Sequence, residues 1–260
     1  MQQVVARIDS ARWFADVQTL ASWDRSSYGT TSLDAARDWI GTQFNALGLS
    51  DGLHAFSMSG AGGGSITRYN VTGAWIGSSQ PERWLIVGAH YDSRNTSSSS
   101  TVNTPGAEDN ASGCAGVIEL ARALLPSQPS RSILFMCYAG EEQGLKGCAA
   151  HVQSLIQSAQ LSSVDAVVTM DMIGYSNDAN LEALYERSAS NSAYLTQFGA
   201  AAATYVPQLA VVTSTNPFGS DHVPNLNAGV RTVLAIENDW DIYPRYHRST
   251  DTPANIGPNA

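Results

Sequence analysis

The chain has 260 residues, enough for one large α/β domain or two small ones. Its hydrophobic fraction of 43% is ordinary for a globular core, and no apolar run approaches the ~20 residues that a membrane-spanning helix needs. The net charge of −9, from 14 basic and 23 acidic residues, argues against nucleic acid as a partner.

Helical and strand-like segments follow one another along the chain. Apolar residues at helical spacing predict helices over residues 3–20 and 33–47, and strand-like segments follow at about 53–58 and 66–76. Four short apolar runs then alternate with helical stretches. The runs are residues 85–87, 133–136, 167–170 and 233–236, and the helices are expected at about 111–125, 147–158 and 191–204.

Short, uniformly apolar strands that alternate with helices are typical of a largely parallel sheet that is covered on both faces. The sequence therefore predicts an α/β fold, a three-layer domain whose mixed, largely parallel central sheet has helices on both faces. No repeat and no linker divides the chain, so we expect residues 1–260 to form a single domain. The serine-rich stretch 97–100 is expected to lie in a loop.

Candidate site residues stand where the predicted strands end. In chain order they are His90 and Asp92, Asp109 just before a helix, the adjacent pair Glu141 and Glu142, then Asp171, and finally His247. In an open parallel sheet the carboxyl ends of the strands form the ligand crevice, so we expect these side chains to converge.

A metal site is indicated by the charge of this set. Two imidazoles and several carboxylates that converge without Lys or Arg would be electrostatically untenable, and bound divalent cations resolve the conflict. Nitrogen and oxygen ligands without thiolate suit zinc, and manganese or cobalt less well. Taken singly, each residue is more often a cap or a satisfied polar group, as Asp109 would be at the start of the helix near residue 111. The metal site is indicated by the set as a whole, because several candidates follow one another along the chain and each lies just after a predicted strand.

Six short blocks of sequence resemble one known family. They are GAHYDS, GAEDNASG, YAGEEQGLKGC, DMIGYS, GSDHVPN and YHRSTDT, and the match extends from about residue 30 to residue 253. Together they look like the signature blocks of the secreted bacterial leucyl aminopeptidase family, the co-catalytic di-zinc exopeptidases, to which glutaminyl cyclases and some carboxypeptidases are related. The resemblance implies a monomeric zinc exopeptidase domain that is secreted or periplasmic, although the chain starts without a signal peptide.

The resemblance also implies a role for each candidate at two zinc ions. The five ligands would be Asp109 as the bridge, His90 and Asp171 on one ion, and Glu142 and His247 on the other. Glu141 would be the general base. Neighbouring side chains diverge in a turn, so Glu142 can reach an ion while Glu141 reaches the water on that ion. This explains why the two glutamates are adjacent.

The implied reaction is hydrolysis of the N-terminal peptide bond of peptides that have a free α-amine. Zinc lowers the pKa of its water from about 15.7 towards ~7, and two ions about 3.5–4 Å apart can hold this nucleophile, polarise the carbonyl and bind the amine. The hydroxide on the metal would attack, with Glu141 taking the proton of the water and passing it to the leaving amine.

Other residues near the blocks are expected to support the site. Asp92 is placed to accept the second imidazole N–H of His90, and Ser220 resembles a serine near the metal, either a weak ligand or a donor to the intermediate. Asp251 is expected to fix a loop or the His247 imidazole. Apolar and aromatic residues flank the metal-binding segments, among them Met172 and Phe218, and suit an N-terminal side chain such as Leu. Tyr243 or Tyr246 would donate a hydrogen bond to the oxyanion.

Three alternatives stay open. A glutaminyl-peptide cyclotransferase would use the same ligand types with one zinc, although those cyclases typically place Trp where this chain has Tyr246. A related carboxypeptidase would need a cationic group for the substrate carboxylate. A non-catalytic binding module would not need an intact ligand set together with Glu141.

Two further expectations concern the cysteines and the end of the chain. With three cysteines, at least one is unpaired within a single chain, and a bridge from Cys148 to Cys114 or to Cys137 is conceivable. The resemblance leads us to expect a helix after the last histidine block, whereas the sequence there reads PANIGPNA.

Overall fold

The computed structural model describes residues 2–97, 101–178, 180–189 and 193–257. Residues 98–100 of the expected serine-rich loop and residues 191–192 of the helix predicted over 191–204 lie outside the described residues.

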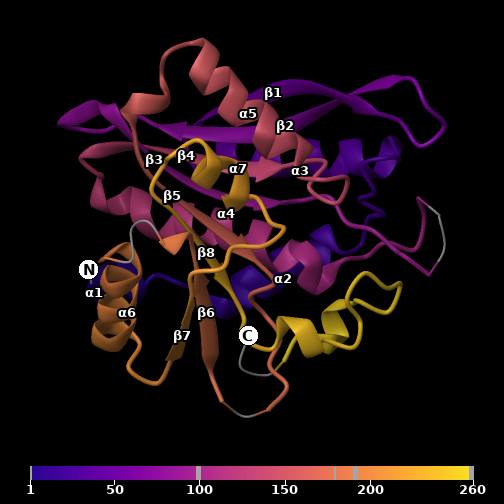
Figure 1. Ribbon diagram of the computed structural model, residues 1–260. Helices are drawn as coiled ribbons and strands as arrows, with labels where there is room; N and C mark the ends of the chain where they lie inside the picture. Colours follow the sequence, from indigo (N-terminus) through magenta and orange to yellow (C-terminus); the bar gives the residue numbers. More distant parts are fainter. Residues whose placement is uncertain (1, 98–100, 179, 190–192, 258–260) are drawn as a thin grey trace.

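One mixed sheet of eight strands runs through the molecule, in the order β1-β2-β4-β3-β5-β8-β6-β7 (Figure 1). The central strands β4, β3, β5 and β8 are parallel neighbours, and β2 and β6 join them antiparallel on either side. The strands are β1 (Ser50–Ser59), β2 (Ser65–Trp75), β3 (Gln80–His90), β4 (Arg131–Tyr138), β5 (Val164–Asp171), β6 (Glu182–Glu186), β7 (Ala210–Ser214) and β8 (Thr232–Ile236). The predicted mixed, largely parallel sheet is confirmed.

Helices cover both faces of the sheet, as predicted (Figure 1). Side chains that alternate along β4 explain the two layers: Phe135 packs with α2, α3 and α4, whereas Met136 packs with α5 on the other face. The helices are α1 (Gln2–Val5), α2 (Ser10–Leu20), α3 (Thr31–Ala46), α4 (Gly113–Leu124), α5 (Lys146–Gln157), α6 (Ala193–Tyr205) and α7 (His222–Asn227). None of the helices within the described ranges is long and apolar enough to span a bilayer.

Three local predictions need correction. The single helix expected over residues 3–20 is two helices, because the Asp9 carboxylate accepts from the backbone N–H groups of Ala11 and Arg12 and so caps α2 at its start. The strands β6 and β7 were not predicted, since they are short and largely half-buried or exposed. The short helix α7 was also missed, and after the last histidine block the described chain forms only the three-residue 3-10 helix Pro253–Asn255.

Both disulfide pairings considered from the sequence are wrong. Cys114 on α4 is bonded to Cys137 on β4, and Cys148 on α5 is free and buried. Cys137 faces the layer that holds α4, whereas Cys148 packs in the cluster on the opposite face of the sheet. The sheet therefore separates Cys148 from the other two sulfur atoms.

Candidate metal centre

The carboxyl ends of the parallel strands bring the predicted site residues together. His90 is the last residue of β3 and Asp171 is the last residue of β5, and the register pairs Gly88 with Thr169 two residues earlier. Glu141 and Glu142 follow β4, whose Tyr138 pairs with His90. The predicted convergence is therefore observed, and it follows from the parallel register of three neighbouring strands.

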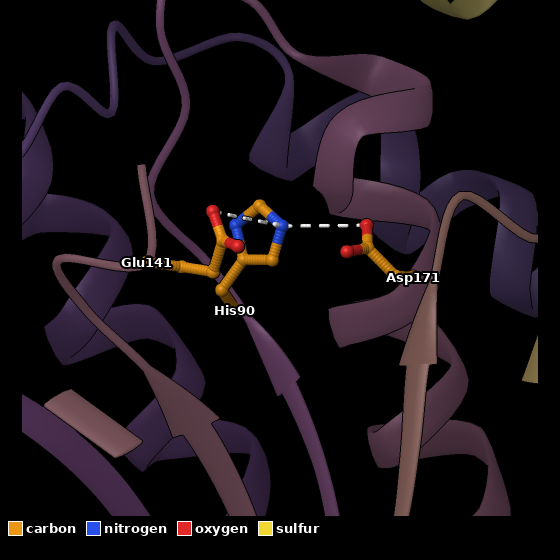
Figure 2. A group of neighbouring side chains, drawn as sticks. All are labelled: His90, Glu141 and Asp171. Atoms are coloured by element: carbon orange, nitrogen blue, oxygen red, sulfur yellow. Dashed lines mark ion pairs between the residues drawn. The ribbon is translucent and has the colours of Figure 1, made fainter. Parts of the chain in front are cut away.

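The side chains form two groups, and the adjacent glutamates belong to different ones. In the first group, the Nε2 atom of His90 lies 3.3 Å from Oδ1 of Asp171 and 4.0 Å from Oε2 of Glu141, and the three side chains point toward one another (Figure 2). The second group holds Asp109, Glu142 and His247. Its His247 Nε2 atom lies 3.0 Å from Oδ2 of Asp109 and 3.1 Å from Oε2 of Glu142.

Asp109 faces both groups, with one carboxylate oxygen toward each. Its Oδ1 atom is 3.3 Å from Nε2 of His90, while its Oδ2 atom is 3.0 Å from Nε2 of His247. A carboxylate that bridges two cations needs this arrangement. Asp251 fixes the backbone that carries Asp109. The two oxygens of the Asp251 carboxylate accept hydrogen bonds from the backbone N–H groups of Glu108 at 2.9 Å and Asp109 at 3.1 Å.

The spacing of these atoms fits zinc. Tetrahedral zinc with bonds of about 2.0–2.1 Å separates its ligand atoms by about 3.4 Å. The distances from His90 to Asp109 and to Asp171, both 3.3 Å, match this separation, and those from His247 are slightly shorter. The 4.0 Å distance to Glu141 is longer, which favours a role for Glu141 beside the ion over one on it.

Unpaired buried oxygens support the same conclusion. Among the described residues, Oδ2 of Asp109, Oε1 of Glu142 and Oδ1 of Asp171 are buried and have no hydrogen-bond donor. Leaving such atoms unpaired away from water is costly, and a cation satisfies them. Imidazole nitrogen and carboxylate oxygen without thiolate are ligands that zinc accepts. The residues present therefore fit zinc, and their two groups fit two ions.

The protein groups alone carry an unfavourable excess of negative charge. Burial, followed by the charge of Asp109, raises the pKa of Glu142 to about 8. Burial also raises the pKa of Glu141 well above its usual value. Burial lowers the pKa of His247, but the close carboxylates of Asp109 and Glu142 outweigh burial and raise the pKa to about 9. Cations at the two groups would offset this repulsion between carboxylates.

Asp92 supports the site differently from the prediction. The Nδ1 atom of His90 is 3.0 Å from the backbone oxygen of Asp92, whereas the nearest carboxylate oxygen is 3.7 Å away. The Nδ1–H of His90 therefore donates to a carbonyl, which leaves the lone pair of Nε2 for a metal. The Asp92 carboxylate instead accepts from the backbone N–H of Glu141 at 3.2 Å and from the hydroxyl of Ser27 at 3.0 Å. It positions the glutamate turn.

Ser220 and Tyr243 have hydroxyl groups that are already engaged. The Ser220 hydroxyl donates to Oδ2 of Asp171 at 2.7 Å, so Oδ1 of Asp171 is the oxygen that faces His90. The Tyr243 hydroxyl donates to Oδ1 of Asp251 at 2.8 Å. Asp251 thus fixes the loop of the bridging Asp109, which is one of the two roles expected for it. Of the two tyrosines proposed as oxyanion donors, Tyr243 has its proton engaged.

Tyr246 stands at the mouth of a small pocket. Its ring stacks on that of His247, with centroids 3.7 Å apart, and 40% of the residue is exposed. The pocket reaches from the metal groups to an apolar wall in which Phe218 stacks on Trp240 at 4.4 Å. The remaining apolar lining residues are Met172, Leu234 and Ile236. Leu234 and Ile236 lie in an apolar run that the sequence assigned to a core strand, and only their two-residue spacing on β8 indicated a shared face.

Arg94 is one of the basic neighbours that the sequence did not indicate; the buried Arg25, close to Asp251, Asp92 and Asp109, is another. The Nε atom of Arg94 is 3.5 Å from Oε2 of Glu142, and its Nη1 group donates to the backbone oxygen of Glu142 at 3.2 Å. The expectation that no Lys or Arg would approach the carboxylates is therefore wrong. The available signal was position, since Arg94 directly follows the block GAHYDS.

Known proteins share both sequence and fold with this chain. A protein of Pyricularia oryzae named "Probable zinc metalloprotease" is 32% identical over 197 residues, which cover 70% of this chain and 39% of that protein. The chain thus spans about two fifths of the length of this curated relative.

Among solved structures, the LapA aminopeptidase of Legionella pneumophila is 25% identical, with a TM-score of 0.78 over 98% of this chain and 69% of its own. An Acidobacteriales bacterium glutaminyl cyclase shares the fold, with a TM-score of 0.77 and 20% identity over 96% of this chain and 88% of its own.

A model of peptidase family M28 matches residues 70–260. This range includes both groups of candidate ligands, the glutamate pair, Ser220 and Tyr246. Because the match covers most of the chain and every residue of the two groups, the chain belongs to peptidase family M28.

Proposed function

We propose that this protein is a zinc-dependent aminopeptidase that removes a hydrophobic N-terminal residue from peptides. The observation that carries the proposal is the position of Asp109 between two imidazole-containing groups, beside a small pocket that has an apolar wall. Family membership and the named relatives support a zinc peptidase. The proposals that cleavage occurs at the N-terminus and that two zinc ions bind rest on the arrangement of the site residues.

Five residues would hold two zinc ions: Asp109 as the bridge, His90 and Asp171 on one side, Glu142 and His247 on the other. When bound, zinc acidifies a water and polarises the scissile carbonyl. The remaining chemistry belongs to side chains of this protein.

Glu141 acts as the general base. Its carboxylate belongs to the first group but stands 4.0 Å from the imidazole of His90, farther than the ligand oxygens. Its backbone N–H is held by Asp92, which fixes the turn. Glu141 takes a proton from the attacking water and returns it to the leaving amine. The Tyr246 hydroxyl, at the pocket mouth, donates to the oxyanion, since the hydroxyl of Tyr243 is engaged by Asp251.

The pocket determines which end of a peptide binds. The stacked, half-buried rings of Phe218 and Trp240 offer an apolar surface to an aliphatic N-terminal side chain such as Leu, whereas Met172 is buried in the core beneath the site. The carboxylates of Asp171 and Glu141 lie at the same pocket and favour a free ammonium group there. A substrate bound in this way presents its first peptide bond to the metal groups.

A glutaminyl cyclase is the second candidate, because a structure of that activity shares the fold. Such an enzyme is expected to need one zinc. The two groups of ligand atoms described here favour two ions, and Tyr246 stands where those cyclases typically have Trp.

The disulfide between Cys114 and Cys137 supports a site of action outside the cytosol, because disulfides persist in oxidising compartments. We therefore propose a secreted or periplasmic enzyme that acts as a monomer on peptides and has no nucleic-acid or membrane partner.

The test compares Leu-p-nitroanilide with its N-acetyl derivative, alongside zinc content per chain. Acetylation removes both the charge and the lone pair of the amine, so only the free-amine substrate should be cleaved. Zinc content should approach two ions per chain. Comparable rates on the two substrates would contradict an aminopeptidase, and one ion per chain at saturating zinc would favour the cyclase.

A further inference from the structure

A second cavity lies between α5 and the sheet, away from the metal centre. Its volume is about 320 Å³, within the range of small-molecule sites. Its apolar walls include Trp84 and Ile86 of β3, Leu134 of β4 and Leu155 of α5. Ile86 comes four residues before the ligand His90 on β3, which is roughly 13 Å along the strand, and no residue of the two metal groups lines the cavity. The cavity is therefore a separate site.

Two imidazoles belong to the lining of this cavity. His151 of α5 and His54 of β1 meet edge to face, with ring centroids 5.5 Å apart, and His151 is only 5% exposed. Burial lowers the pKa of both, that of His151 to about 4, so both rings are neutral near pH 7. Among the described residues that line the cavity there is no Lys, Arg, Asp or Glu. The cavity thus offers polar groups without charge.

Hydrogen bonds of Asn70 determine which nitrogen of His54 carries the proton. The Oδ1 atom of Asn70 accepts the backbone N–H of Ala139 at 3.0 Å, and its Nδ2 group donates to the backbone oxygen of Gly147 at 2.9 Å. The amide orientation is therefore fixed, and the same Nδ2 group lies 3.2 Å from Nδ1 of His54. Nδ1 of His54 accepts this bond, which leaves the proton on Nε2.

His151 carries its proton on the corresponding atom. Its Nδ1 atom is buried and has no hydrogen-bond partner among the described residues. Because a buried N–H without an acceptor is rare in native proteins, the proton belongs on Nε2. No described residue pairs with Nε2 either, so this N–H is available to a molecule in the cavity. An occupant must supply the acceptor.

We propose that this cavity binds a small uncharged molecule with an apolar body and one carbonyl-type oxygen, which accepts the Nε2–H of His151. The apolar body packs between the Trp84 ring and the aliphatic side chains. The volume is about twice that of the ~150 Å³ cavity that holds benzene, so a body of two fused rings fits. A charged molecule is excluded, because it would lose its hydration without meeting an opposite charge.

The experiment measures the dissociation constants of 1-tetralone and tetralin, in which a carbonyl replaces one CH2 group, by ligand-observed NMR. Both should bind the wild-type protein, whereas the anion 1-naphthoate should not. His151→Phe should weaken the binding of 1-tetralone by roughly 5–10-fold and change that of tetralin less than twofold, since only the ketone loses a hydrogen bond. Gln153→Phe is the matched control, because it adds the same ring at an exposed position of α5 outside the cavity, and it should keep all affinities.

Histidine side-chain ¹⁵N spectra of the wild-type protein locate the ligand. They should show His54 and His151 as Nε2–H tautomers, and 1-tetralone should shift the Nε2 signal of His151 while those of His90 and His247 stay unchanged. If His151→Phe misfolds, these spectra still decide the question. Shifts at His247 without a shift at His151 would place the ketone at the metal centre and overturn the inference. Absence of 1-tetralone binding, tighter binding of 1-naphthoate, or an equal loss of both neutral ligands in His151→Phe would overturn it too.

Discussion

Replacing Glu141 and Glu142 singly by Gln separates a base from a ligand. Glu141 Oε2 stands 4.0 Å from His90 Nε2, beyond the about 3.4 Å separation of tetrahedral zinc ligands, whereas Glu142 Oε2 is 3.1 Å from His247 Nε2. Glu141→Gln should therefore keep zinc near two ions per chain and lower kcat by about 10²–10⁴-fold, or roughly 3–5 kcal/mol. The side chain of Glu141 is 10% exposed, so bulk water has little access to replace it as the base.

Glu142→Gln should behave differently, because a neutral amide replaces an anionic ligand. Loss of a residue that only hydrogen-bonds to a metal ligand lowers metal affinity by roughly 10–100-fold, and loss of the ligand itself should lower zinc affinity at the second group by more. Activity should recover in part when zinc is added, and the activity of Glu141→Gln should not. The assay is metal analysis and Leu-p-nitroanilide kinetics on both variants, with and without added zinc. If Glu141→Gln loses zinc while Glu142→Gln retains it, the two roles are reversed.

Three further predictions concern stability and the oxyanion. Cys114→Ala with Cys137→Ala should lower the free energy of unfolding by about 3 kcal/mol in denaturant titrations, since the bridge spans 23 residues; a change below 1 kcal/mol would contradict this. Burial lowers the pKa of His151 to about 4 from an unfolded value of 6.5. The contribution of His151 to stability should therefore fall by about 3 kcal/mol as the pH drops from 6.5 to 4, and it is measured as the difference in unfolding free energy between the wild type and His151→Gln across that range. Tyr246→Phe should lower kcat by about 10²-fold with KM nearly unchanged, whereas Tyr243→Phe should mainly cost about 1 kcal/mol of stability; the reverse pattern would assign the oxyanion to Tyr243.

The convergence of the site could be predicted because strand ends are visible in the sequence. Short apolar runs define where β3, β4 and β5 stop, and parallel neighbours place their ends at one edge. The first polar residues after each run therefore had to meet. The roles of His90, Glu141 and Asp171 as ligand, base and ligand still depend on family resemblance, since the strand pattern does not distinguish one carboxylate from another.

The surrounding hydrogen bonds could not be predicted, because they depend on distances of less than an ångström. The Nδ1 atom of His90 lies 3.0 Å from the backbone oxygen of Asp92 and 3.7 Å from its carboxylate, and the sequence does not show which of the two accepts the hydrogen bond. The pairing of Cys114 with Cys137 likewise depends on which face of β4 carries the Cys137 side chain, because a shift of one residue would turn that side chain away from α4 and toward the face that holds Cys148. Arg94 was missed since nothing in its neighbours fixes the direction of a long side chain in a loop.

The segment that carries His247 links metal binding to the order of the bridging ligand. Its Asp251 holds the backbone N–H groups of Glu108 and Asp109, and the backbone N–H of Ala107 donates to the Asp251 carbonyl at 3.1 Å. The same segment supplies His247 to the second group and Tyr246 to the pocket mouth. An ion bound between Asp109 and His247 would therefore join two segments that Asp251 already holds together. Because Asp251 aligns the Asp109 carboxylate without a metal, less ordering free energy would oppose metal binding, and the segment that contains His247 would supply both a ligand and the support for another.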